Sequence, residues 1–81
     1  MKIRYKGEIS YTIDSEHPDI KCIKDWSEDK IFTFSDTYIF DYHLYDKDEI
    51  ISYIQNDLRL VAGGGYNSKH IHNVTFKINQ I

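Results

Sequence analysis

Two histidines separated by one residue, His70 and His72, are the side chains best suited to chemistry in this sequence. In an extended strand, residues two apart lie on the same face, so the two imidazoles could act together. A metal site needs at least three protein ligands, and no neighbouring motif supplies the third. Strand alternation also places both histidines with the core-facing residues Val74, Phe76 and Ile78. We therefore expect hydrogen-bonded histidines at the boundary of the core, with no metal and no cofactor; a metal-dependent enzyme is an alternative.

A run of three glycines, Gly63–Gly65, is the second feature that could bind a ligand. Phosphate-binding loops use the backbone amides at the N-terminus of a helix, where the helix dipole is positive. These glycines follow a predicted helix and meet its negative end, so we interpret them as a C-cap with a flexible tip. An alternative is a nucleotide-sequestering protein that combines the glycines with Arg59, His70 and His72. Such a pocket would require an oligomer, and the sequence allows either a monomer or a dimer.

The sequence contains no motif for nucleophilic catalysis, and we expect no enzymatic activity. Cys22 is the only cysteine and stands among apolar neighbours, which suits a small buried residue. A single cysteine excludes a disulfide framework and fits a reducing compartment. The N-terminus has no charged-then-apolar leader and the chain has no long apolar run, so we expect a cytoplasmic protein that does not enter a membrane.

Negative charge is concentrated in the middle of the chain. The net charge is −3, but the segment from Asp14 to Glu49 carries eleven acidic residues and four lysines. This bias favours a basic partner and repels nucleic acid, although a solvated acidic surface that keeps a small domain soluble is the alternative interpretation. Trp26, an aromatic residue among acids, is typical of a binding hot spot, or else folds back over the end of a sheet. The predicted partner-binding residues are Asp25, Trp26, Glu28, Asp29, Asp46, Asp48 and Tyr66.

The fold class predicted from hydrophobic periodicity is α+β, in a single domain that spans residues 1–81. A helix is expected at about 46–62, because Asp46 can act as N-cap, Glu49 follows three residues later, and an apolar stripe has helical spacing. Period-two alternation predicts the strands. They are expected at 2–13, 20–24, 30–34, 37–42 and 70–78. The expected architecture is a mostly antiparallel sheet of four to five strands with the helix packed across it.

A single-stranded nucleic-acid-binding module is a further alternative. Aromatic side chains on strands can stack on bases, and basic residues are interleaved with the tyrosines. The basic residues concerned are Lys2, Arg4, Lys6, Arg59, Lys69 and Lys77. They are sparse, and the aromatic signature of the common RNA-binding sheet is absent.

The short single domain, the acidic stretch 25–29 and the strand–helix–strand segment from Tyr38 to Ile78 together resemble the small phage-encoded anti-CRISPR proteins. This resemblance implies a stoichiometric inhibitor, encoded by a phage or mobile element, that blocks a CRISPR effector or a similar host defence complex. In such an inhibitor the acidic side chains would take the place of phosphates in a basic channel. We therefore predict a non-catalytic protein-binding inhibitor that acts in the cytoplasm of the host.

Overall fold

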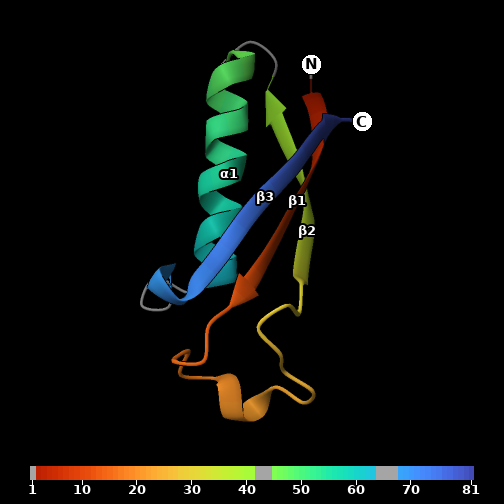
Figure 1. Ribbon diagram of the computed structural model, residues 1–81. Helices are drawn as coiled ribbons and strands as arrows, with labels where there is room; N and C mark the ends of the chain where they lie inside the picture. The colour runs from red at the N-terminus through yellow and green to blue at the C-terminus, as the bar shows by residue number, and fades with distance from the viewer. Residues whose placement is uncertain (1, 42–44, 64–67) are drawn as a thin grey trace.

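The computed structural model describes residues 2–41, 45–63 and 68–81, which form one helix over a three-stranded antiparallel sheet (Figure 1). The strands are β1 (Lys2–Ile13), β2 (Phe32–Asp41) and β3 (Ile71–Gln80), and the helix is α1 (Lys47–Gly63). Two short 3₁₀ turns, Ile20–Cys22 and Ser68–His70, lie in the connections. The strand order is β2-β1-β3, so the first strand is central. The predicted α+β class is confirmed.

The predicted number of strands is too high. The segments expected at 30–34 and 37–42 contribute to one continuous strand, β2, whose full length pairs with β1, and Tyr42 lies outside the described residues. The strand expected at 20–24 is instead a 3₁₀ turn, in which the Cys22 N–H donates to the Asp19 carbonyl at 2.9 Å. Cys22 is exposed there and not buried as the sequence suggested. A short apolar run forms a strand only where another strand pairs with it, and this segment lies beyond the end of the sheet.

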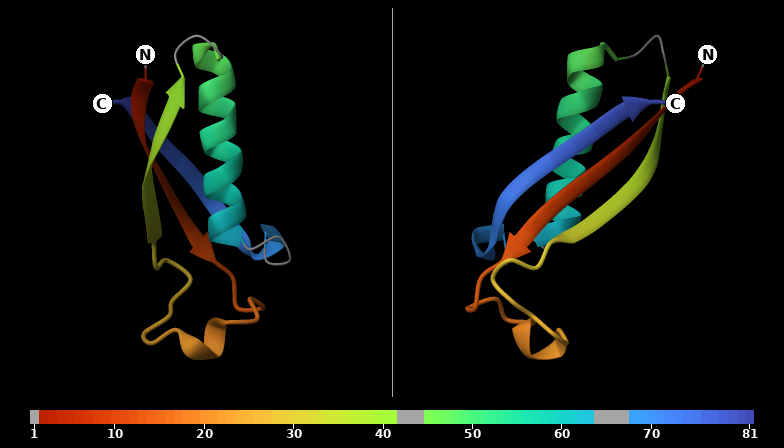
Figure 2. Two further views of the ribbon diagram at one scale, coloured as in Figure 1. Left: turned by 180° about the vertical axis from the view of Figure 1, so that it is seen from behind. Right: turned by 45° about the vertical axis from the view of Figure 1, so that its right-hand side comes forward.

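The core lies between α1 and one face of the sheet. Alternate residues of β1 point toward the helix, and the side chains of Ile9, Ile50, Ile54 and Leu58 are fully buried between the two layers. Gly7 lies where the helix passes closest to β1. The opposite face of the sheet carries no layer of described residues (Figure 2).

The predicted helix start is confirmed by its cap. The Glu49 N–H donates to Asp46 Oδ1 at 2.9 Å, which satisfies one of the amides that the first helical turn leaves unpaired. The Ile50 N–H donates to the Asp46 carbonyl at 3.1 Å, the first bond of the helical ladder. Asp46 therefore stabilises the helix, whatever else it contacts.

A β-bulge in β3 changes which side the histidines face. Ser10 pairs with Thr75, but Thr12 pairs with His72, so β3 contains one extra residue between these pairs. Asn73 takes up the extra residue with φ 54°, a left-handed conformation that asparagine tolerates. The bulge reverses the alternation: Ile71 becomes buried, whereas His72 is exposed. The prediction that His72 faces the core with Val74 is wrong.

Residues 14–31, here called the acidic arm, connect β1 to β2 and extend beyond the end of the sheet (Figure 1). The arm lies at the end of the molecule opposite the start of α1, and the molecule measures 45 × 21 × 18 Å. Among the described residues, no helix is long and apolar enough to cross a membrane.

Candidate functional site

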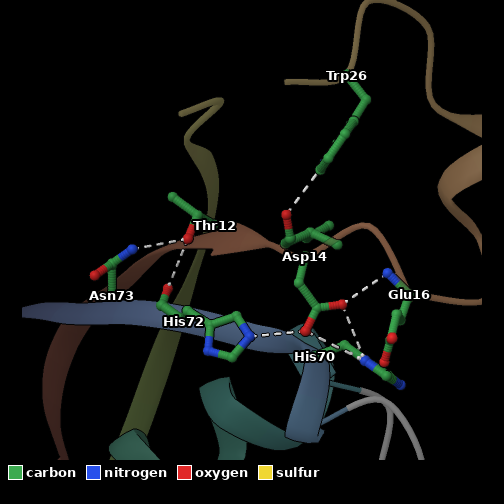
Figure 3. A network of polar contacts seen from close by, with 8 residues as sticks. Thr12, Asp14, Glu16, Trp26, His70, His72 and Asn73 are labelled. Atoms are coloured by element: carbon green, nitrogen blue, oxygen red, sulfur yellow. Dashed lines mark hydrogen bonds and ion pairs between the residues drawn. The ribbon is translucent and has the colours of Figure 1, made fainter. Parts of the chain in front are cut away.

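Asp14 forms the root of the acidic arm, where the arm leaves β1 (Figure 3). Its Oδ2 lies 2.8 Å from His72 Nε2, and its Oδ1 lies 3.1 Å from His70 Nδ1. The Glu16 N–H also donates to Oδ1 at 3.0 Å, and the Asp14 N–H donates to the His70 carbonyl at 3.0 Å. One carboxylate thus holds the root of the arm against the start of β3.

The hydrogen bonds that Asp14 accepts lower the pKa of its carboxyl group. The hydrogen bond from His72 is the largest cause that lowers the pKa of Asp14, with smaller contributions from Glu16 and His70. An ionised carboxylate only accepts hydrogen bonds, so His70 carries a proton on Nδ1 and His72 carries one on Nε2.

His70 is hydrogen-bonded at the edge of the core, as the sequence predicted, whereas His72 is hydrogen-bonded but exposed. The His70 side chain is 12% exposed, and the ring of His17 packs edge-on against it with centroids 6.1 Å apart. His17 is itself buried, and its Nδ1 accepts the Asp19 N–H at 3.1 Å. In the described ranges no three His, Cys, Asp or Glu side chains have the geometry to hold a metal ion. The cluster therefore fastens two segments together.

Trp26 is the second anchor of the acidic arm. Its Nε1–H donates to the Ile13 carbonyl at 3.1 Å, and its ring is half-buried (Figure 3). Asp25 directly before it has φ 57°, which turns the chain back toward the sheet. Of the two interpretations of Trp26, the structure places it over the end of β1. The remaining exposed part of the ring can still contact a partner.

Four of the predicted contact residues lie together on the arm: Asp25, Trp26, Glu28 and Asp29. The three acids are exposed, and no described side chain forms an ion pair or hydrogen bond with their carboxylates. Lys30 lies beside them, but its Nζ donates to the Lys24 carbonyl at 3.0 Å. The arm therefore presents unpaired negative charge on a segment that is fixed at two points.

The fold does not bring Asp46 and Asp48 to the arm. Asp46 and Asp48 lie at the start of α1, at the opposite end of the long axis (Figure 1). Tyr66 lies outside the described residues, as do Gly64 and Gly65. The acidic residues thus form two separate groups, one on the arm and one around the helix start.

Two residues of the alternative nucleotide site, Arg59 and His72, lie on opposite faces of the sheet, whereas His70 and His72 meet at Asp14. The aromatic side chains of the strands pack toward α1, so they offer no stacking surface on the uncovered face of the sheet. Arg59 lies over the Phe76 ring on the helix side, 5.7 Å from its centroid. His72 pairs with Thr12 on the uncovered face.

Two residues with informative contacts were not singled out from the sequence. In the sequence, Asp14 was identified only as one of the acidic residues. Its contacts with His70 and His72 depend on a β-bulge, which the alternating pattern of the sequence does not reveal. Tyr53, which lies on the helix against Phe40, was not singled out. Its position outside the main apolar stripe of the helix was the available signal.

Comparison of the chain with protein-family models, with curated proteins and with solved structures finds no match.

Proposed function

We propose that the protein is a non-catalytic inhibitor, encoded by a phage or mobile element, that binds a CRISPR effector or similar host defence complex through its acidic arm. It would act in the cytoplasm of the host cell, where such complexes work. The observation that carries the proposal is the set of exposed carboxylates of Asp25, Glu28 and Asp29 on an anchored arm, with which no side chain in the described part of the chain pairs.

The length of the acidic arm supports a binding role. Irregular connections in compact domains rarely exceed about 12–15 residues unless they serve a function. The arm spans residues 14–31 and contains only one short 3₁₀ turn. Its two anchors, Asp14 and Trp26, restrict it before any partner arrives, which lowers the entropic cost of binding.

The charge distribution favours a local acidic contact over mimicry of a whole nucleic-acid strand. Between the two acidic ends, the uncovered face of the sheet carries the exposed side chains of Arg4, Lys6 and Lys77. A basic channel lined for phosphates would repel this middle region. The arm alone would therefore enter the basic surface, and its charge would accelerate the encounter at low salt.

Two charge-neutralising variants with the same composition test the proposal. One is Glu28→Gln with Asp29→Asn on the arm, and the matched control is Asp48→Asn with Glu49→Gln at the helix start. Both would be titrated against a panel of purified CRISPR effector complexes, with inhibition of target cleavage and binding as readouts. We expect at least a ~10-fold loss of affinity for the arm variant, a weaker salt dependence, and an unchanged thermal midpoint.

The panel can contradict the proposal in two ways. Inhibition that the arm variant retains in full would remove the arm from the interface. A loss confined to the helix-start variant would move the contact to the other end of the molecule.

A further inference from the structure

A second surface suited to binding lies at the end of β2, far from the acidic arm. A groove of about 470 Å³, here called the edge groove, is lined by Ile39, Phe40, Tyr45, Glu49 and Tyr53 among others. Its lining residues come mainly from the end of β2 and from the start of α1, two segments that lie at the same end of the molecule (Figure 1).

The backbone of β2 offers hydrogen-bonding groups on the side away from β1. The Ile81 N–H donates to the Arg4 carbonyl at 2.8 Å, so the even-numbered residues of β1 bond toward β3. In an antiparallel ladder the backbone groups alternate, so the odd-numbered residues bond toward β2. Their partners include Tyr38 and Phe40, which leaves Ile39 with its N–H and C=O directed outward. No described strand pairs with this edge.

Aromatic rings form the helix side of the edge groove. Phe40 meets Tyr45 at 5.8 Å between centroids and Tyr53 at 5.6 Å, both nearly perpendicular. Phe40 is buried, but Tyr45 and Tyr53 are 48% and 58% exposed. On the other side of the same strand Ile39 is 59% exposed. Large aromatic and aliphatic side chains therefore flank both sides of an edge that has no neighbouring strand.

The charges around the edge groove define the kind of partner. Glu49 and Asp41 line the groove, Asp46 and Asp48 lie beside it at the start of α1, and Asp36 lies farther along β2; these five acids outnumber the nearby bases, which are Lys2 in the lining, Lys47, and Arg4 opposite Ile39. An extended chain added to an edge strand sends alternate side chains to the two faces. The matching chain alternates apolar residues with Lys or Arg.

We propose that the edge groove binds an extended, basic and apolar segment of a partner protein, which pairs with β2 as a fourth strand. A second copy of this chain fits less well, because β2–β2 pairing would bring the acids of two copies together. Asp36 accepts the Thr37 N–H at 2.8 Å and occupies that outward amide, so pairing is directed to the end of β2 near Ile39. This surface is independent of the acidic arm.

The test uses a synthetic ten-residue peptide of alternating Lys and Ile, with an alternating Glu and Ile peptide as charge control. Amide chemical shifts of the labelled full-length protein are followed during titration. We expect saturable 1:1 binding of the Lys peptide, with the largest shifts at Ile39, Phe40 and Tyr53. Ile39→Pro should weaken binding at least ~10-fold, because it removes an outward N–H without breaking a bond to β1.

Three controls keep the result decisive. Gln80→Pro, which removes the corresponding outward N–H on β3, should bind like the wild type. Tyr53→Ala should also weaken binding. Because Tyr53 lies on the exposed surface of the helix, this variant tests the same groove if the Ile39→Pro protein does not fold. The arm variant Glu28→Gln with Asp29→Asn should bind normally, which separates this proposal from the proposed function.

Several outcomes would overturn the edge groove proposal. They are the absence of saturable binding, equal binding of the Glu peptide, and shifts centred on β3. A dimer of the wild type that Ile39→Pro dissociates would show that the occupant is a second copy.

Discussion

Replacing Gly7 by alanine should destabilise the protein, because this position sets how closely α1 approaches the sheet. A Cβ at Gly7 would lie 2.6 Å from Ile54 Cγ2, 3.1 Å from Leu58 Cδ1 and 3.3 Å from a Tyr38 ring carbon. Ile54 is fully buried, and a β-branched side chain in a helix has essentially one χ1 rotamer, so its methyl group cannot turn away. The helix itself must move.

The expected change in the free energy of unfolding is the difference between two opposing effects. Overpacking of a core costs about 1–3 kcal/mol, whereas removing a glycine from a strand gains about 0.5–1 kcal/mol. A contact of 2.6 Å belongs in the upper half of the overpacking range, about 2–3 kcal/mol, so the net loss in the free energy of unfolding is about 1–2.5 kcal/mol. For a domain of this size each kcal/mol lowers the midpoint by about 4–8 °C, so Gly7→Ala should melt roughly 4–20 °C below the wild type.

Thermal and urea unfolding, followed by circular dichroism, measure this change. Glu8→Ala, at the next position of the same strand, is the matched control and should stay within about 0.5 kcal/mol. The double variant Gly7→Ala with Ile54→Ala should lose less than the sum of the single losses, because the new methyl group fills part of the space left at residue 54. A Gly7→Ala protein as stable as the wild type would refute the close approach of helix and sheet.

Four further changes test the anchors and the cap. Asp46→Ala should cost about 1 kcal/mol through loss of the N-cap, whereas Asp48→Ala should cost less than about 0.5 kcal/mol in the same urea unfolding assay. Because hydrogen bonding lowers the pKa of Asp14 below its ordinary value of 3.8, its stabilisation is present above that pH and is lost as the pH falls below it. The melting points of wild type and Asp14→Ala should therefore differ at pH 6 and converge toward pH 3. Trp26→Ala should speed tryptic cleavage of the acidic arm while the midpoint of the domain changes little; an unchanged cleavage rate would exclude the anchor. Burial, reinforced by the hydrogen bond to a neighbouring carboxylate, raises the pKa of Tyr38, so Tyr38→Phe should remove a late-ionising tyrosine from an absorbance titration above pH 10.

The helix and the central strand were predictable because their signals are local. The capping pair Asp46 and Glu49 and the apolar stripe determine α1 within a residue at each end. The unbroken alternation through Gly7 favoured one long strand, and β1 runs from Lys2 to Ile13. Both predictions rest on patterns among residues near in sequence, although β1 itself pairs with two distant strands.

The sheet was less predictable because its strands depend on distant partners. The segment 20–24 has the composition of a strand, but nothing pairs with it, so it forms a 3₁₀ turn in the acidic arm. The bulge at Asn73 reverses the alternation of β3, and only the pairing with Thr12 reveals it. These errors arise from tertiary contacts that override local preference.

The sequence predicted which types of residue form the candidate site, but not which of the predicted residues lie together. The acids from 25 to 29 stand close in the sequence and stay together on the arm. Asp46 and Asp48 were grouped with these acids only because they belong to the same negatively charged segment of the sequence. The fold places them at the other end of the molecule. The edge groove likewise unites residues of β2 and α1 that no local pattern connects.

The most direct test of the acidic arm as the inhibitory contact uses its own cysteine. Cys22 is exposed on the arm and is the only cysteine in the chain, so a benzophenone maleimide can be attached there. The control carries the same label at the helix start, in a Cys22→Ser, Asp48→Cys variant. The proposed function predicts that irradiation with a CRISPR effector cross-links the Cys22 label to the effector, and that excess guide or target nucleic acid suppresses the cross-link. Cross-linking from residue 48 and not from Cys22 would contradict the account.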